Sequence, residues 1–246
     1  MKKIIIANWK MNPQSAKEAI SLFDQVIKAA ARLKNLDLIF CPPFVWLGVI
    51  SEKLKKIKKI LPAAGRIFLG AQDIFWQSRG AFTGEISGPM LKNLDCQYVI
   101  IGHSERRWII GETNEIVNKK FLAALNFGLI PILAVGEKER KKDFLDFLKN
   151  QLEESIKDVS KEAKFIIAYE PVWAIGTGLP DRPEDTELAV NFIKKIAGEN
   201  LILYGGSVTS KNIKSFLEKA GVDGALVGGA SLDAKEFAKI LKIANL

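Results

Sequence analysis

The chain has 246 residues, of which 48% are hydrophobic and 26% charged, and its 36 basic and 28 acidic side chains give a formal net charge of +8. This composition excludes an intrinsically disordered chain and predicts a packed globular core. No apolar run reaches the roughly 18 residues that a transmembrane helix needs, so we expect no membrane partner. The two cysteines, Cys41 and Cys96, are too few for a disulfide framework and favour a reducing, cytoplasmic compartment.

The positive charge fits either nucleic acid or an anionic metabolite as partner. The densest basic run, Lys53–Ile60, alternates with apolar residues and contains no aromatic residue. That pattern is typical of the solvated face of a helix, whereas single-stranded nucleic acid is bound with aromatic stacking residues among the basic ones. We therefore expect no nucleic acid partner.

Short apolar runs recur along the chain, and we predict a β-strand at each. Their nearly continuous apolarity is typical of parallel strands that are buried on both faces. The predicted strands are Ile4–Ala7, Leu38–Phe40, Ile67–Leu69, Tyr98–Ile101, Ile130–Val135, Phe165–Ala168, Leu201–Leu203 and Ala225–Val227.

Amphipathic stretches between these runs predict helices. The first begins after Ser15, because Ser15 and Glu18 have the spacing of a capping box at a helix N-terminus. Further helices are predicted over Asn114–Asn126, Lys138–Glu154, Pro183–Ala197, Ser210–Ala220 and Ala234–Ile243.

The alternation of eight strands with helices predicts an α/β fold, a TIM (β/α)8 barrel that forms a single domain over residues 1–246. The alternative is a doubly wound open sheet. Such a sheet normally carries a glycine-rich phosphate turn after its first strand, and residues 8–12 contain no glycine. The polar segment Gly70–Gly84 is long for a strand-to-helix connection and is predicted to serve an interface or a site.

In a barrel of this kind the active site forms where the strands end, so polar residues after apolar runs are candidates. Asn8 and Lys10 follow the first predicted strand, and His103 and Glu105 follow the fourth. His103 is the only histidine in the chain. A lone histidine is usually structural, but its place at a strand end favours a functional role. One histidine and two dispersed cysteines do not supply the usual ligands of a metal site, so none is predicted.

Glu170 follows the sixth predicted strand and precedes Pro171, whose ring restricts the backbone at that point. This placement predicts a general base at the barrel mouth; a glutamate that only caps or pairs at the strand end is the alternative.

Residues 172–178 are apolar and contain two glycines. We interpret them as a closing lid, with a buried structural loop as the alternative.

Glycine-rich turns follow the last two predicted strands, at Gly205–Ser207 and Gly228–Gly229. Barrels commonly bind phosphate with backbone N–H groups at this place. Two such turns in succession predict a phosphorylated substrate, which the net positive charge would attract.

Five motifs together resemble the triosephosphate isomerase family over essentially the whole chain. They are Ala7–Asn12, Gly80–Glu85, Gly102–Arg107, Ala168–Gly178 and Tyr204–Val208. The resemblance implies an aldose–ketose isomerase of glycolysis and gluconeogenesis. Such an enzyme interconverts dihydroxyacetone phosphate and D-glyceraldehyde 3-phosphate through an enediolate, without a cofactor or metal.

The resemblance also implies residue roles. Glu170 would be the base, His103 the neutral electrophile, and Lys10 the positive charge beside the enediolate. Asn8 would line the substrate pocket, and Glu105 would orient or balance Lys10. The phosphate-binding backbone would come from Gly176, Ser207, Gly228 and Gly229.

The family resemblance further implies a homodimer, with a tetramer as the alternative. In the dimer the segment Gly70–Gly84 would insert into the neighbouring subunit and bring Thr83 near its active site. The apolar residues Ile74–Trp76 favour such burial over exposure to water.

Two rival functions remain: another phosphate-binding barrel isomerase or lyase, and a basic protein that binds nucleic acid. The chain departs from the family pattern at Leu179–Asp181, which replaces a lysine-containing hinge.

Overall fold

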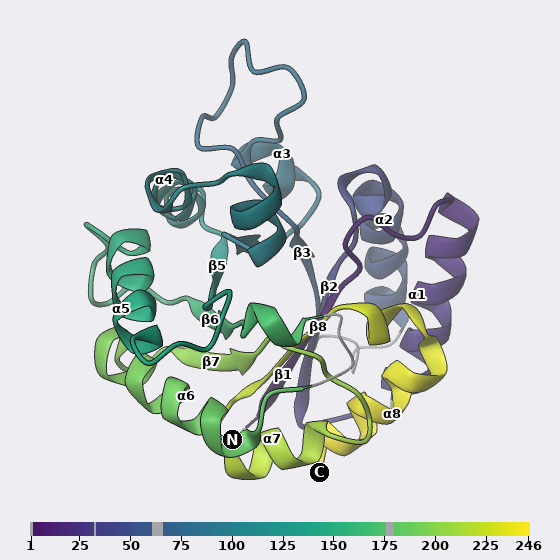
Figure 1. Cartoon of the computed structure of the whole chain (residues 1–246). Helices are drawn as coiled ribbons and strands as arrows, with labels where there is room; N and C mark the ends of the chain where they lie inside the picture. Colours follow the sequence, from purple (N-terminus) through teal and green to yellow (C-terminus); the bar gives the residue numbers. More distant parts are fainter. Residues whose placement is uncertain (1, 32, 61–65, 176–179) are drawn as a thin grey trace.

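The structure is a computed structural model that describes residues 2–31, 33–60, 66–175 and 180–246. Within these residues, eight parallel strands pair in sequence order and β8 closes onto β1, so the sheet is a closed barrel (Figure 1). The strands are β1 Lys3–Asn8, β2 Leu36–Cys41, β3 Ile67–Ala71, β4 Tyr98–Ile101, β5 Ile130–Val135, β6 Ile166–Tyr169, β7 Leu201–Tyr204 and β8 Gly224–Val227. The predicted barrel is confirmed, and the predicted strand bounds differ from these by no more than two residues.

The apolar strand residues form two separate cores because successive side chains point to opposite faces of a strand. In β1, Ile4 and Ile6 belong to the core inside the barrel. Ile5 and Ala7 belong to the larger core between the barrel and its helices. Both faces of each strand are therefore buried, which explains why the predicted strands are apolar without alternation.

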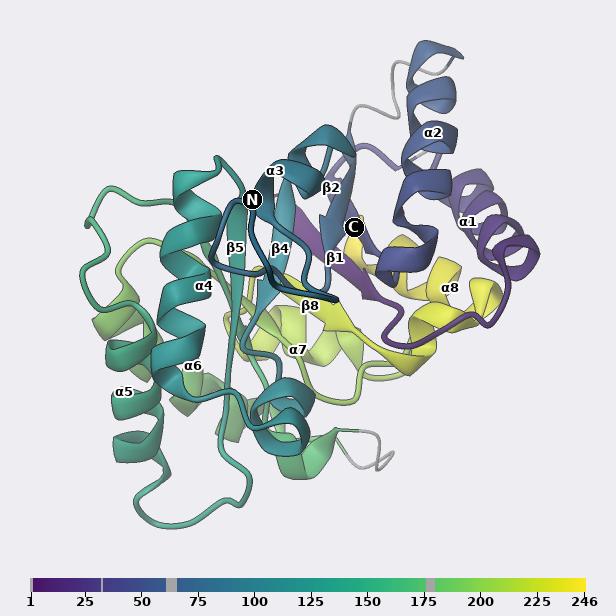
Figure 2. The same ribbon diagram turned by 90° about the horizontal axis from the view of Figure 1, so that it is seen from above.

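Helices cover the outside of the barrel, and helices α2, α1 and α8 pack side by side (Figure 2). Ser15 Oγ accepts a hydrogen bond from the Glu18 backbone N–H, so the first helix begins where predicted. The helices are α1 Ala16–Ala30, α2 Phe44–Ile60, α3 Gly88–Asn93, α4 Asn114–Asn126, α5 Phe144–Ser155, α6 Pro183–Ala197, α7 Ile213–Lys219 and α8 Ala234–Ala244. Short helical turns cover Arg106–Ile110, Val172–Ala174 and Gly229–Leu232.

Two helix predictions were wrong at their N-terminal ends. The helix predicted from Lys138 begins at Phe144, because residues 138–143 are all charged and offer no apolar side chain for the core. The helix predicted from Ser210 begins at Ile213, because the Asn212 side chain bonds both Thr209 N and Ser207 O and holds the preceding residues in a turn.

The connection between β3 and α3, residues 72–87, projects from the barrel and is called the projecting loop (Figure 1). The predicted loop Gly70–Gly84 began too early, because Gly70 and Ala71 pair with β4 as part of the sheet.

The apolar residues of the projecting loop are not all exposed. Ile74 and Phe75 are buried within the chain, and Trp76 stacks on Phe75 with ring centroids 4.0 Å apart. Ile74 and Phe75 therefore need no partner subunit for burial, so the prediction made for Ile74–Trp76 was wrong for these two residues. Phe82, nearer the tip of the loop, is exposed.

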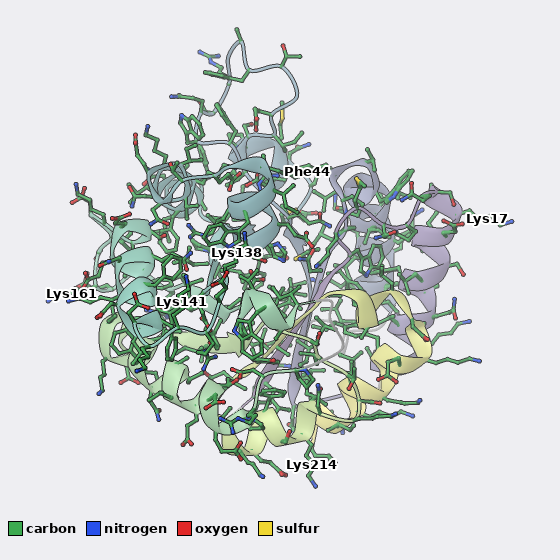
Figure 3. All side chains as sticks on the ribbon, in the orientation of Figure 1. Lys17, Phe44, Lys138, Lys141, Lys161 and Lys214 are labelled. Carbon is green, nitrogen blue, oxygen red and sulfur yellow. The ribbon has the colours of Figure 1, made fainter. Side chains whose placement is uncertain are left out.

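The positive charge is spread over the surface. Lys17, Lys161 and Lys214 lie on different sides of the molecule (Figure 3). In the basic run Lys53–Ile60, Lys55 is exposed while Leu54 is buried, as expected for a solvated helix face. Among the described residues, no helix is long and apolar enough to cross a membrane.

Candidate active site

A cavity of about 570 Å³ opens at the carboxyl ends of the strands. The predicted site residues in its wall follow strands that are far apart in the sequence. They share one cavity because the closed barrel brings the carboxyl ends of those strands into one ring. They are Asn8, Lys10, His103, Glu170, Ser207, Gly228 and Gly229. Thr83 is exposed in the projecting loop and does not line the cavity. Gly176 lies outside the described residues, as do Thr177 and Gly178 of the predicted lid.

Lys10, two residues after the end of β1, has a left-handed backbone conformation with φ of 54°. Such a conformation is costly for a residue with a side chain, so neighbouring contacts must hold it. The Lys10 N–H donates to Asn8 Oδ1 at 3.1 Å, and Gln72 Nε2 donates to the Lys10 carbonyl at 2.8 Å. The Lys10 ammonium meets Glu105 Oε1 at 2.6 Å. Glu105 does not line the cavity but is the counter-charge of Lys10.

His103 is buried, and its hydrogen bonds identify its tautomer. Nδ1 accepts a hydrogen bond from the Glu105 backbone N–H at 3.2 Å, so Nδ1 carries no proton. The ring proton is then on Nε2, which lies 3.2 Å from Glu170 Oε1. An imidazole held in this way presents one N–H donor to the cavity.

Glu170 is 1% exposed, and its two carboxylate oxygens have different environments. Oε2 accepts a hydrogen bond from the Ser104 N–H at 2.9 Å. Oε1 has no aligned hydrogen bond in the described part of the chain, although His103 Nε2 is close. The Glu170 N–H donates to the carbonyl of Val135, the last residue of β5. One oxygen is anchored by a hydrogen bond, and the other faces His103.

Another part of the cavity wall is made of backbone from the turns after β7 and β8. The N–H groups of Ser207, Gly228 and Gly229 have no protein acceptor among the described residues. A Cβ at Gly228 would lie 3.1 Å from Lys10 Cε, so glycine lets this backbone approach the lysine closely. Ser207 Oγ donates to the Ala174 carbonyl at 2.8 Å and ties the turn after β7 to residues 172–174. Free N–H groups of this kind bind oxyanions.

Sequence reasoning missed two polar residues that shape the site. Gln72 binds the carbonyls of both Lys10 and Cys41, and its position directly after β3 was the available signal. Arg107 is buried and donates to the Gly102 carbonyl at 2.7 Å and to Ser155 Oγ at 3.1 Å. Burial lowers the pKa of Arg107 to about 10, so the side chain stays positive at neutral pH. Nothing in the sequence distinguishes this arginine from an exposed one.

Comparisons with known proteins identify the family to which this chain belongs. The family model for triosephosphate isomerase matches residues 3–244. The triosephosphate isomerases of Dictyoglomus thermophilum and Aquifex aeolicus are 46% and 42% identical to this chain, and each alignment covers 98% of this chain and 99% of the relative. The crystal structure of triosephosphate isomerase from Bartonella henselae superposes with a TM-score of 0.81 at 36% identity, covering 99% of both chains. This chain belongs to the triosephosphate isomerase family, and it is an isomerase that interconverts dihydroxyacetone phosphate and D-glyceraldehyde 3-phosphate.

Proposed function

We propose that Glu170 is the general base of this isomerisation, that His103 is its electrophile and that Lys10 stabilises the charge of the enediolate. The main support is the 3.2 Å separation of Glu170 Oε1 and His103 Nε2 in one cavity wall with Lys10. A base and a hydrogen-bond donor at this separation can act on neighbouring carbon and oxygen atoms of one small substrate.

In the proposed mechanism, Glu170 Oε1 removes a proton from the carbon next to the substrate carbonyl. The electron pair moves to the carbonyl oxygen, which the His103 N–H and the Lys10 ammonium stabilise as an enediolate. His103 then moves a proton between the two oxygens. The protonated Glu170 returns its proton to the adjacent carbon, so the base is regenerated and the ketose becomes the aldose.

The substrate phosphate would bind at the turns after β7 and β8 in the same cavity wall. The free N–H groups of Ser207, Gly228 and Gly229 support this assignment. Gly176, the fourth proposed phosphate ligand, lies outside the described residues. Asn8 lines the same cavity, and Glu105 would keep the Lys10 ammonium in place through their 2.6 Å contact.

The Glu170→Gln variant tests the assignment of the base. It preserves the shape of the side chain but removes the proton acceptor, so turnover should fall by about three orders of magnitude. Competitive inhibition by inorganic phosphate and the circular dichroism spectrum should not change. The control is Glu139→Gln, because Glu139 is an exposed carboxylate. Near-normal turnover of Glu170→Gln would overturn the assignment.

We also propose that the active form is a homodimer in which Thr83 of the projecting loop approaches the partner's active site. Exposed large apolar side chains gather on segments that follow β1, β2, β3 and β4, and such a concentration is typical of an interface. They are Met11, Val45, Phe82, Met90, Trp108, Ile109 and Ile110. Because the carboxyl ends of the strands share one end of the barrel, a partner at that side would lie close to the cavity.

Light scattering tests the homodimer and should give about twice the 27.3 kDa chain mass; four times that mass would indicate the tetramer. Phe82→Asp should produce a less active monomer whose activity rises with protein concentration. Leu188→Asp is the control, because Leu188 is also an exposed apolar residue but lies on α6. A fully active monomer of the unchanged chain would contradict the proposal.

We further propose that residues 1–246 fold as one domain in the cytoplasm. The closed barrel, in which the first and last strands pair, supports a single cooperative unit. Urea unfolding should then give one transition by both fluorescence and circular dichroism. The free thiols of Cys41 and Cys96 fit a reducing compartment.

A further inference from the structure

The connection between β6 and α6 is described over residues 170–175, its β6-side flank, and over residues 180–182, its α6-side flank. A polar cluster connects the end of β5 to both flanks. We call it the flank cluster. It consists of Glu137, Arg140, Tyr169, Trp173 and Asp181, and of these Glu137, Tyr169 and Asp181 are buried. Residues 176–179, between the two flanks, lie outside the described residues and are not part of the cluster.

The flank on the β6 side is held by Glu137. Glu137 Oε1 accepts hydrogen bonds from the Tyr169 hydroxyl at 3.0 Å and from Trp173 Nε1 at 3.2 Å. The Glu137 carbonyl accepts a third from the Val172 N–H at 3.0 Å. One of these donors, Tyr169, precedes the proposed base Glu170 in the sequence, and the other two follow it. Glu137 therefore holds the chain on both sides of the proposed base.

The flank on the α6 side is held by Asp181, whose side chain is 1% exposed. Its Oδ2 atom accepts hydrogen bonds from Arg140 Nη2 at 2.9 Å and from Thr186 Oγ1 at 3.0 Å. Its backbone N–H donates to the Tyr204 hydroxyl at 3.1 Å. A buried carboxylate needs such partners, because an unpaired one would lose its hydration without compensation.

Arg140 is the group that joins the two flanks. Its Nε donates to Glu137 Oε1 at 2.8 Å, while Nη2 donates to the Tyr169 hydroxyl at 2.8 Å and to Asp181 at 2.9 Å. The guanidinium also lies 5.5 Å from the centre of the Trp173 ring. Burial by itself lowers the pKa of Arg140, but Tyr169, Glu137 and Asp181 more than offset this effect and raise it. One cation therefore pairs both with Glu137, which holds the β6-side flank, and with Asp181 on the α6-side flank.

The flanks also form part of the cavity wall. Ile175, two residues after Trp173, lines the cavity, and so does Pro180, the residue before Asp181. Glu170 directly follows Tyr169. A shift of either flank would therefore move the cavity wall, and a shift on the β6 side would also move the carboxylate that faces His103.

We propose that Arg140 and Asp181 act as a pair of positioning residues for the isomerisation, an inference that rests on Glu170 being the base. Neither side chain lines the cavity. They act by holding the two flanks at one spacing, so that the base and the part of the cavity wall that contains Ile175 and Pro180 keep their places. A displacement of about 1 Å far from the reacting atoms can cost roughly 100-fold in rate.

The experiment compares Arg140→Met, Asp181→Asn and the double variant. Each single variant should lower kcat/KM by roughly 10- to 100-fold and weaken binding of 2-phosphoglycolate, an analogue of the enediolate phosphate, by a similar factor. The double variant should lose little more than the worse single one, because the two side chains act through one contact. Arg140→Lys, which keeps the charge, should recover part of the loss.

Arg182→Met is the matched control. Arg182 lies next to Asp181 in the sequence and forms an exposed ion pair with Asp185, at 2.7 Å, so its loss should leave kcat/KM unchanged. The fraction of turnover that ends as methylglyoxal and inorganic phosphate gives a second measurement. This fraction should rise in Arg140→Met, because a misplaced base returns its proton more slowly while the enediolate still eliminates phosphate.

If Arg140 and Asp181 have only a structural role, the variants should have a lower melting temperature. Their kcat/KM, 2-phosphoglycolate binding and methylglyoxal fraction should then match those of the unchanged chain when folded protein is compared. That result would overturn the inference. If Arg140→Met does not fold, the isosteric Asp181→Asn decides the question by the same measurements. The proposed function fails separately, since it depends on Glu170→Gln and not on these variants.

Discussion

Gly205 is the position where one added methyl group should disturb the proposed base most directly. It follows β7, and a Cβ there would lie 2.8 Å from Glu170 Cγ and 3.2 Å from the Tyr169 carbonyl oxygen. Carbon atoms in contact are normally about 3.5–4.0 Å apart, so the Glu170 side chain would have to move by roughly 0.7–1.2 Å. The Tyr169 carbonyl belongs to the β6 backbone, which prevents the new methyl group from retreating in that direction.

Gly205→Ala should therefore lower kcat/KM by roughly 100-fold, or about 2.7 kcal/mol of transition-state stabilisation. A coupled assay with D-glyceraldehyde 3-phosphate measures this, on protein whose folded fraction is checked by circular dichroism. Overpacking should also lower the free energy of unfolding by about 1–3 kcal/mol.

Gly70→Ala is the matched control for crowding alone. Its Cβ would lie 2.7 Å from Cys41 Sγ and 3.1 Å from Ile39 Cγ2 inside the barrel, so the overlap is similar but the base is not touched. This variant should lose stability and keep most of its kcat/KM per folded molecule. The reasoning fails if folded Gly205→Ala turns over normally, or if Gly70→Ala loses as much activity as Gly205→Ala.

Two further variants test the electrophile and a buried ion cluster. His103→Gln removes the Nε2 donor but no apolar core contact. It should slow exchange of protons between substrate and solvent by at least about 100-fold and leave the circular dichroism spectrum unchanged. A variant that unfolds would instead indicate a structural histidine. Lys120 contacts the buried carboxylate of Asp73 at 2.7 Å and also pairs with the buried Glu112. Lys120→Met removes this cation, so the free energy of unfolding measured by urea denaturation should fall by about 3–5 kcal/mol. Lys119→Met, at the exposed neighbour, should change the free energy of unfolding by less than about 0.5 kcal/mol, and equal losses would show that burial of the cluster does not matter.

The architecture was predictable because its signal is local. Strands buried on both faces must be apolar throughout, so runs such as Ile130–Val135 mark β5 to the residue. Helix α3 was missed because it has only six residues and contains both glycine and proline. The turn Arg106–Ile110 was missed because it carries two arginines and three apolar residues without a helical stripe. The start of α5 was misplaced because charged residues continue a helical pattern in sequence without supplying a buried face.

The strand-end residues of the candidate site were predictable for a different reason. A closed parallel barrel collects every strand end in one ring, so the polar residues Lys10, His103 and Glu170 had to lie near one another. The contacts that hold them were not predictable. The hydrogen bond from Arg140 to Asp181 joins residues 41 positions apart, and no periodicity in the sequence marks them as partners. Such partners become visible only when packing has brought their elements together.

The imidazole of His103 has no counterpart elsewhere in the sequence, which contains a single histidine. In ¹⁵N-labelled protein the two ring nitrogens of His103 would therefore give imidazole resonances without background and without any need for assignment by mutation. Since Nδ1 accepts the Glu105 N–H, only the Nε2 resonance should show a directly attached proton. The unmodified chain thus contains its own spectroscopic label at the proposed reaction centre, and the same ring is the one place where an imidazole-specific reagent could report whether the cavity is occupied.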